Sequence, residues 1–340
     1  MQDQLVFLIG SPRSGSTLLS RMLGAHSQIF APEEPHLITP MAHLGFYDSV
    51  ESAPYDPIIT RAAARALVSD LPDGEETYLN ALRCYSDAIY RGLLEHGGAG
   101  SKRLLDKTPA YALSLDFLAK LYPEARYIVL TRHPIAVWSS FVDSFFDGDD
   151  RAAHAHNPLL ERYVPAIARF LRNAKVPTHR VRYENLVQEP DANAQELCAF
   201  LGLDFEPGMV EYGSAPGARG KSARGLGDPT TVGRETRPTT ESVTKWVGAA
   251  KGLDQRAALY QEIVARLADE DLETWGYSRS EIAGQLAQID LDGKPAPRPR
   301  LTRYALERKL LVAVRHRIQP GNALGKGVKK VREICDVLLR

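Results

Sequence analysis

Cysteine is scarce in this sequence, and long apolar segments are missing from it. Cys84, Cys198 and Cys335 are odd in number, far apart and without metal-ligand spacing. This usage predicts a reduced, cytoplasmic protein without a metal site, in which Cys84 and Cys198 are buried in helices. No apolar run approaches the roughly 18 residues of a membrane span, and Leu5–Ile9 is too short for a signal-peptide core. We therefore expect no transmembrane or secretory segment.

The sequence also lacks net charge, because 42 Lys and Arg residues balance 42 Asp and Glu residues. No overall field would attract nucleic acid, so we expect no nucleic-acid partner. The charges are unevenly placed: residues 294–340 hold 13 basic and 3 acidic residues, an excess of +10, and residues 1–293 carry −10. Residues 291–340 are predicted to be a Pro-rich linker and a basic amphipathic tail. The tail has two interpretations, a contact with a partner domain or membrane surface, or a solvated extension.

One stretch, residues 5–23, predicts the start of an α/β fold. The apolar run Leu5–Ile9 is typical of a buried parallel strand, and glycines mark the turn after it. A helix is expected from about Ser16, since the apolar residues that follow share one helical face. A loop between such a strand and helix aims backbone N–H groups and the positive helix end at an anion.

This loop departs at one position from the nucleoside-triphosphate pattern G-x-x-x-x-G-K-[ST]. Gly10 and Gly15 have the required spacing, but Ser16 stands where the lysine would be. Without that lysine the β- and γ-phosphates are held poorly, so ATP or GTP hydrolysis is not expected. Arg13 supplies a cation within the loop, and its planar fork suits a tetrahedral oxyanion. The loop predicts an anion site for something other than a triphosphate; the alternative is an ordinary turn before a core helix.

A second apolar strand, Arg126–Leu130, is followed by Arg132 and by a helix that begins at Pro134. Ser140 lies less than two turns into that helix, so Arg132 and Ser140 can converge on one phosphate. Each charge-assisted hydrogen bond to that phosphate would contribute about 1.5–3 kcal/mol.

These two segments resemble segments of a known family. The sequence SPRSGSTLL at residues 11–19 is similar to the 5′-phosphosulfate loop of sulfotransferases that use 3′-phosphoadenosine 5′-phosphosulfate (PAPS), and YIVLTRHP with Ser140 is similar to their 3′-phosphate segment. The resemblance is closest to the tyrosylprotein and bacterial polyketide branches. It implies an α/β, P-loop-like three-layer fold with a central parallel sheet flanked by helices, over residues 1–290. Residues 40–100 would form a helical insertion at the acceptor pocket, and residues 215–246 a nucleotide lid.

For the donor, the resemblance implies PAPS as co-substrate, 3′-phosphoadenosine 5′-phosphate (PAP) as product, and no metal. The loop would hold the phosphosulfate, and the tyrosine of RYENLV would lie near the adenine. The donor residues so assigned are Arg13, Ser14, Gly15, Ser16 and Thr17 in the loop, Arg132 and Ser140 at the 3′-phosphate, Tyr183 at the adenine and, more loosely, Thr230, Arg224 and Lys245 in the lid.

For catalysis, the stretch AHSQIFAPEEPH is similar to the segment that carries a general base in the same branches, and the match falls on Glu34. His36 is the rival, because an imidazole needs less pKa tuning to act near neutral pH. Lys107 of DKTP matches the family lysine at the bridging oxygen, where a fixed cation stabilises the growing negative charge. Solvated loop polarity is the alternative for Glu34 and His36, and a surface pair with Asp106 is the alternative for Lys107.

The acceptor is expected to be a hydroxyl on a small metabolite or on a carrier-tethered chain; a peptide tyrosine, glycan or lipid stays open. A P-loop phosphotransferase and a non-catalytic nucleotide-binding scaffold are the competing functions. Three further segments have expected structures: residues 147–156 as a solvated polar loop rather than a metal site, residues 179–187 as a strand, and residues 253–272 as one helix.

Overall fold

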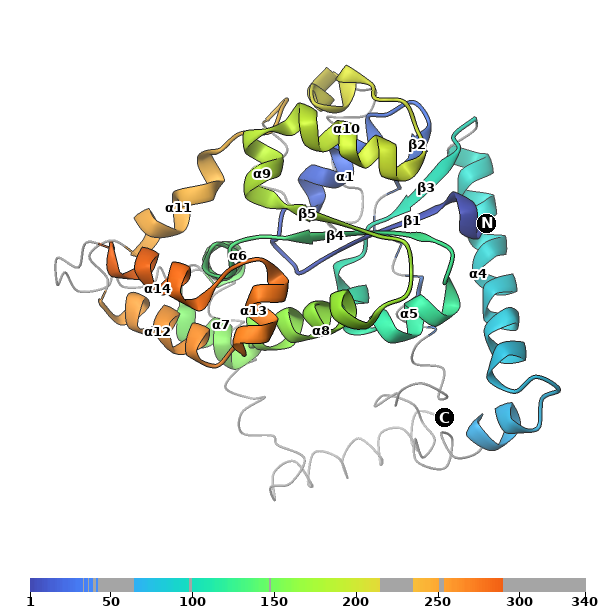
Figure 1. Cartoon of the computed structure of the whole chain (residues 1–340), viewed down its shortest axis with the longest axis horizontal. Helices are drawn as coiled ribbons and strands as arrows, with labels where there is room; N and C mark the ends of the chain where they lie inside the picture. Colours follow the sequence, from blue (N-terminus) through green and yellow to red (C-terminus); the bar gives the residue numbers. More distant parts are fainter. Residues whose placement is uncertain are drawn as a thin grey trace, which may run out of the picture.

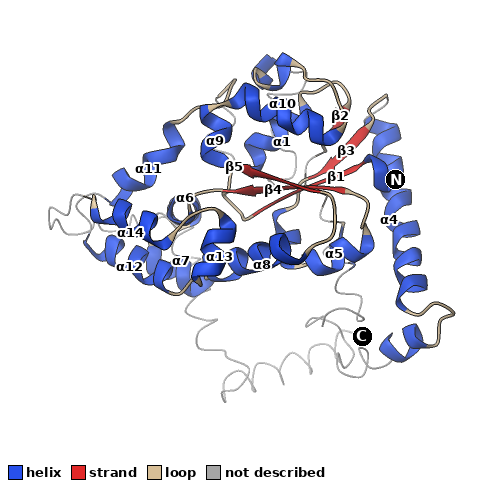
Figure 2. Cartoon of the chain, in the orientation of Figure 1, coloured by secondary structure: helices blue, strands red, loops and turns tan. Residues whose placement is uncertain are grey.

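The computed structural model describes residues 1–32, 34–35, 37–38, 41, 64–97, 100–146, 148–214, 235–250 and 254–289. Within those ranges, five parallel strands form one sheet in the order β2-β3-β1-β4-β5 (Figures 1 and 2). β1 is therefore the central strand. The strands are β1 (Leu5–Gly10), β2 (Ile29–Phe30), β3 (Arg103–Asp106), β4 (Arg126–Thr131) and β5 (Thr178–Arg182).

The register of the central strands brings the two predicted anion-binding segments together. Gly10 at the end of β1 lies opposite Leu130 of β4. The loop after β1 and the residues after β4 therefore leave the sheet side by side. On the other flank, Phe7 pairs with Asp106 and Phe30 of β2 pairs with Leu104. Carboxyl ends of parallel strands form the usual ligand edge of such a sheet.

Helices cover both faces of the sheet, because the side chains of β1 alternate between two cores. Val6 and Leu8 pack into one core and Leu5, Phe7 and Ile9 into the other. The first core is covered by α1 (Ser16–Gly24), α9 (Tyr183–Gln188) and α10 (Pro190–Leu201). Figure 1 shows α5 (Leu115–Leu121), α8 (Leu159–Asn173) and α13 (Asp269–Trp275) on the opposite face. The other helices that contribute to the second core are α4 (Glu75–Gly97), α6 (Pro134–Phe145), α7 (Asp150–His156), α11 (Glu241–Ala250), α12 (Asp254–Ala265) and α14 (Arg279–Ala287).

The three-layer α/β architecture expected from the sequence is confirmed. The strands β1 and β4 and the helix α1 begin within a residue of their predicted positions. α10 ends at Leu201 and is followed by Gly202, which takes the left-handed φ of 68° that is common directly after a helix. The structure also contains short 3₁₀ turns: η1 (Gln2–Gln4) before β1, η2 (Pro109–Leu113) between β3 and α5, and η3 (Pro207–Met209) and η4 (Tyr212–Ser214) after α10.

The prediction of a solvated loop over residues 147–156 is wrong for most of that segment, which forms α7. Asp149 caps the helix by accepting a hydrogen bond from the Ala152 amide at 3.0 Å. Ala153 is fully buried against the core, and Asp150 pairs with a distant arginine, Arg256. The helix depends on long-range partners that a local reading of the sequence does not contain.

The strand expected over residues 179–187 and the helix expected over residues 253–272 are each divided into two elements in the structure. β5 ends at Arg182 and α9 follows, because Tyr183, Leu186 and Val187 are buried at helical spacing. The single helix expected over residues 253–272 is broken between α12 and α13. Arg279 bonds to the chain at this break, since its guanidinium donates to the carbonyls of Val264 in α12 and of Leu267 in the connection to α13.

Cys198 is buried in α10 beside Met209, as expected, whereas the expectation for Cys84 is wrong because that thiol lies on the exposed side of α4. None of the helices in the described ranges is long and apolar enough to cross a membrane. The linker and tail at residues 291–340 and residues 215–234 of the expected lid lie outside the described residues. The domain boundaries stay predictions.

Candidate donor cleft and acceptor-side ion pair

The loop between β1 and α1 turns through two residues with left-handed backbone. Arg13 has a φ of 70° and Gly15 a φ of 98°. The Ser14 amide donates to the Ser11 carbonyl across the turn at 3.1 Å. A non-glycine residue in this region costs about 1–3 kcal/mol, and such residues cluster at ligand sites. The strained residue in this loop is the arginine that the sequence singled out.

Gly15 is required for a second reason, which is its contact with α9. A Cβ atom at this position would lie 2.4 Å from Cδ2 of the Tyr183 ring. The aromatic ring therefore packs directly on the loop backbone. α1 begins at the next residue without a side-chain cap, so its first backbone N–H groups are available to an anion.

A cleft with about 990 Å³ of free space, part of it open to solvent, lies over this loop. Ser14 is the exception among the predicted loop residues, because its side chain is buried beneath the loop beside Gly10. The cleft is lined by most of the predicted donor residues, namely Arg13, Gly15, Ser16, Thr17, Arg132, Ser140, Tyr183 and Lys245.

The two predicted anion-binding segments are in direct contact inside this cleft. Nε of Arg13 donates to Oγ of Ser140 at 3.2 Å, although the two residues are 127 positions apart. The guanidinium of Arg13 also lies 5.9 Å from the ring of Phe145 on the same helix, α6. The loop after β1 and the helix after β4 therefore form one surface.

Arg132 connects three parts of the cleft with one another and with α13. Its Nη1 donates to the carbonyl of Arg13 at 3.2 Å and its Nη2 to that of Ser242 on α11 at 2.6 Å. Its guanidinium lies 4.3 Å from the centre of the Tyr183 ring, and its carbonyl accepts from Nε1 of Trp275 at 2.8 Å. The described residues offer no partner to its buried Nε–H. Burial lowers the pKa of Arg132, yet an arginine stays charged.

His133 supports the cleft as a neutral ring. Burial lowers its pKa to about 4, so the imidazole is uncharged near neutral pH. The ring stacks on Trp246 of α11 with 4.6 Å between centroids, and its backbone amide donates to Glu184 at 3.0 Å. Since Trp246 lines the cleft, the stack fixes one of its walls.

Glu34 and Lys107 form an ion pair with each other, at a different place from the cleft lining. Nζ of Lys107 donates to Oε1 of Glu34, and the side chains are only 6% and 13% exposed. Lys107 directly follows β3, and Glu34 follows β2, the neighbouring strand. Neither residue lines the donor cleft. The surface pair of Lys107 with Asp106 is wrong, because Lys107 is buried and bonds to Glu34.

Asp106, which the sequence analysis named only as an alternative surface partner of Lys107, organises the surroundings of this pair. Its fully buried carboxylate accepts hydrogen bonds from the hydroxyls of Tyr90 (2.7 Å), Tyr111 (3.0 Å) and Thr108 (2.9 Å). Burial and the nearby Asp106 charge raise the pKa of both tyrosines, which remain neutral donors. The Tyr111 oxygen also accepts from the Ile38 amide at 3.0 Å. The segment that carries Glu34 is thus tied to the strand end that carries Lys107.

Three predicted residues, His36, Thr230 and Arg224, lie outside the described residues. Lys245 lies on α11, where it lines the cleft. Over the described ranges, no group of three or more His, Cys, Asp or Glu side chains could hold a metal ion.

The comparisons with known proteins identify the family of this chain. The profile of the Sulfotransferase family matches residues 5–207, from β1 to the start of η3. The chain belongs to the sulfotransferase family. The match includes the loop, Glu34, Lys107 and the Arg132 segment, and it ends before α11.

Two curated relatives show how far the similarity extends. The nodulation protein NoeE of Sinorhizobium fredii is 34% identical over 221 residues, which are 59% of this chain and 50% of that protein. This sulfotransferase-family chain therefore matches half the length of NoeE. Protein-tyrosine sulfotransferase 1 of Danio rerio is 24% identical over 247 residues, 72% of this chain and 66% of that protein.

Among solved structures, the sulfotransferase domain of the Synechococcus PCC 7002 olefin synthase is 26% identical to this chain. The alignment covers 71% of this chain and 86% of that domain, with a TM-score of 0.47. A sulfotransferase domain from the curacin biosynthetic pathway is 23% identical over 77% of this chain and 96% of that domain, with a TM-score of 0.48.

Sequence reasoning missed several residues that hold the cleft lining and the Glu34–Lys107 pair in place. The role of Asp106 could have been predicted from the sequence. Asp106 ends an apolar strand, and a carboxylate that is buried there must accept hydrogen bonds from nearby donors. Ser242 carried no such signal, because it contributes only its backbone carbonyl. Trp275 carried none either, because its hydrogen bond to the Arg132 carbonyl joins residues 143 positions apart.

We predict opposite effects for alanine at two glycines. Gly15→Ala places a side chain at a φ of 98° and against Tyr183, so we expect a loss of more than about 1 kcal/mol in the free energy of unfolding. Gly92→Ala, in α4 with nothing within 4 Å of the added Cβ, is the matched control and should gain roughly 0.5–1 kcal/mol. Chemical denaturation measures both, and equal effects would contradict the packing described for Gly15.

We predict that His133 makes stability fall in acid. Its pKa is about 4 in the fold, against 6.5 for an unperturbed histidine, so the unfolded chain takes up the proton first as pH falls. The free energy of unfolding should drop by up to about 3 kcal/mol between pH 6.5 and pH 4. His133→Gln should flatten this pH dependence, measured by denaturation at each pH. The exposed His96→Gln is the control, and an equally steep profile in His133→Gln would refute the prediction.

Proposed function

We propose that this protein transfers a sulfuryl group from PAPS to the hydroxyl of an acceptor. The observation that carries the proposal is the convergence of Arg13, Ser140 and Arg132 in one cleft at the carboxyl ends of β1 and β4. These side chains come from the two segments that resemble the phosphosulfate and 3′-phosphate sites. Family membership supports the reaction class.

The chemistry of the cleft fits a donor with anionic groups at separate positions. Four cations and two carboxylates line it, the basic side chains being Arg13, Arg132, Arg237 and Lys245 and the acidic ones Asp143 and Glu235. The buried Nε–H of Arg132 and the first amides of α1 offer further donors. Ser16 in place of a lysine disfavours a nucleoside triphosphate.

When bound, PAPS supplies an activated sulfuryl group on a phosphate oxygen. Glu34 accepts the proton of the acceptor hydroxyl while the acceptor oxygen forms its bond to sulfur. Lys107 donates to the bridging oxygen, which keeps the electron pair as its bond to sulfur breaks. Arg13 and the amides of the loop hold the 5′ end, and Arg132 with Ser140 holds the 3′-phosphate.

The Glu34–Lys107 pair supports these roles in two ways. Both groups are nearly buried, so each would act more strongly on a reacting group than it would in water. Tyr111 and Asp106 tie the Glu34 segment to the end of β3, which limits the distance over which either group can move. In the donor-bound protein, Lys107 would exchange Glu34 for the bridging oxygen and release the carboxylate to act as a base.

The proposed acceptor is an alcohol on a small metabolite or on a carrier-tethered chain. Relatives named as protein-tyrosine sulfotransferases add a peptide tyrosine to the candidates that need testing. All of these present a neutral hydroxyl whose proton must be removed, so they share the requirement for Glu34.

We predict that the protein binds PAP and that ATP with Mg²⁺ binds weakly or not at all. Arg132→Ala should weaken PAP binding at least tenfold, because a charge-assisted hydrogen bond contributes about 1.5–3 kcal/mol. Isothermal titration calorimetry measures both ligands, with the exposed Arg162→Ala as the control. Tight ATP binding without PAP binding would replace this proposal with a P-loop phosphotransferase.

We predict that Glu34→Gln lowers kcat by about 10²–10⁴, with little change in PAP affinity. Lys107→Ala should lower kcat by about 10²–10³, the effect of losing one group at a developing anion. Transfer of labelled sulfate to a panel of alcohols, carrier-bound chains and tyrosine peptides measures turnover, with exposed Glu124→Gln as the control. Full turnover in Glu34→Gln would assign the base to His36, and PAP binding without transfer to any acceptor would favour a scaffold.

A further inference from the structure

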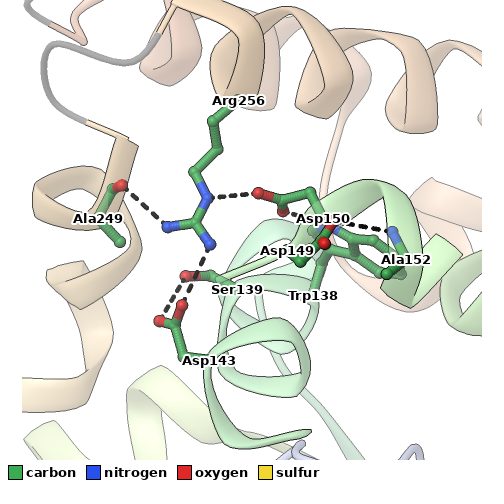
Figure 3. Close-up of polar contacts among 8 residues, drawn as sticks. All are labelled: Trp138, Ser139, Asp143, Asp149, Asp150, Ala152, Ala249 and Arg256. Carbon is green, nitrogen blue, oxygen red and sulfur yellow. Dashed lines mark hydrogen bonds and ion pairs between the residues drawn. The ribbon is translucent and has the colours of Figure 1, made fainter. Parts of the chain in front are cut away.

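Arg256, at the start of α12, joins three helices beside the donor cleft (Figure 3). Its Nε donates to Oδ2 of Asp150 in α7 at 2.7 Å, and its Nη2 donates to Oδ1 of Asp143 in α6 at 3.1 Å. Its Nη1 donates to the carbonyl of Ala249 in the last turn of α11 at 3.0 Å. The side chain is only 9% exposed. All three nitrogens of the guanidinium therefore have partners on different elements.

Asp150, one of the three partners of Arg256, is held in place by the core. Asp150 is 11% exposed, and its Oδ1 also accepts from Nε1 of Trp138 at 3.0 Å. Trp138 is fully buried in α6. A partly buried ion pair with further hydrogen bonds holds its geometry well, whereas removal of one partner leaves an uncompensated charge. Asp150 is thus an anchor from which Arg256 reaches the cleft.

The Asp143 end faces the cleft itself. Asp143 lines it, one turn beyond Ser139 and close to Ser140 on α6. Figure 3 shows its carboxylate joined by hydrogen bonds both to the Ser139 hydroxyl and to the Arg256 guanidinium. An unpaired carboxylate in this position would repel a phosphate bound by Ser140. Four cations and two carboxylates give the lining a formal charge of +2, which becomes +3 when Arg256 neutralises Asp143.

The Ala249 end holds α11 in place. α11 supplies Ser242, Lys245 and Trp246 to the cleft, and Ser242 is the residue whose carbonyl Arg132 bonds. The carbonyls of a last helical turn lack partners within the helix, and a cation there is stabilising. Arg256 supplies that cation, so it connects the wall that carries Lys245 to the helix that carries Ser140.

We propose that Arg256 is a positioning residue that sets the affinity of the cleft for its phosphate-bearing donor without contacting it. It holds α11 against α6 and neutralises Asp143 at the cleft surface. This inference rests on the proposed function, because the donor it concerns is the one proposed to bind there. The proposed role of Arg256 in holding α11 against α6 applies to the ligand-free protein as well.

The experiment compares PAP affinity by calorimetry with amide hydrogen exchange in α11. In Arg256→Gln, we expect PAP to bind at least tenfold more weakly and the amides of residues 241–250 to exchange faster in the ligand-free protein. Adding Asp143→Asn to this variant should recover part of the PAP affinity, because it removes the unpaired carboxylate. Faster exchange should remain in the double variant, since the bond to Ala249 is still missing.

Two other variants separate positioning from general stability. Arg256→Lys keeps the positive charge but loses the planar guanidinium that bonds to three partners. Its PAP affinity and the amide exchange rates of residues 241–250 should lie between those of the wild type and those of Arg256→Gln. Arg266→Gln removes a neighbouring exposed arginine that pairs with Glu262 and Glu161, and it should keep PAP affinity within about twofold, as for other surface substitutions.

The outcomes distinguish this inference from the proposed function. If the wild type binds PAP and Arg256→Gln and Arg256→Lys bind it equally well, the role of Arg256 is refuted while the donor assignment stands. If the wild type does not bind PAP, the proposed function fails, and the exchange measurement still decides whether Arg256 holds α11. Unchanged exchange in residues 241–250 of Arg256→Gln would refute that role.

Discussion

The cleft depends on one buried guanidinium. Arg132 leaves β4 beside the loop that follows β1, bonds to a carbonyl of that loop and to one of α11, and packs on the ring of Tyr183. A cation with few water contacts is costly unless carbonyls and an aromatic face replace the lost hydration. These partners come from three separate elements, the loop after β1, α11 and α9. The contacts that offset the cost of burying the Arg132 charge therefore also hold the walls of the cleft together.

Much of the fold and part of the site could be predicted from the sequence because the signals are local. The apolar run and glycines of residues 5–15 specify strand, loop and helix, and the missing lysine at Ser16 restricts the kind of anion. Arg132 and Ser140 could be paired because a strand end and the first turns of the next helix have fixed geometry. These inferences need only the residues of one supersecondary unit, and the structure places both segments at one cleft.

The rest could not be predicted because it depends on partners far away in the sequence. α7 is held by Arg256, more than 100 residues further on, and Asp106 is buried among hydroxyls from α4 and η2. The pairing of Glu34 with Lys107 follows from the adjacency of β2 and β3, which no pattern in either segment encodes. Burial decides whether a polar residue is a solvated surface group or a member of a network, and burial is known only when the fold is known.

The Glu34–Lys107 pair also affects the electrostatic field that a charged ligand would meet at a distance from the protein. Two opposite charges in contact produce a dipole, whose field declines more steeply with distance than that of a single charge. An approaching polyanion would therefore be guided by the arginines of the neighbouring cleft, and would sense the buried lysine only at close range. The arginines of the cleft and the Glu34–Lys107 pair thus differ in the range of their electrostatic fields, although both lie at the carboxyl ends of the strands.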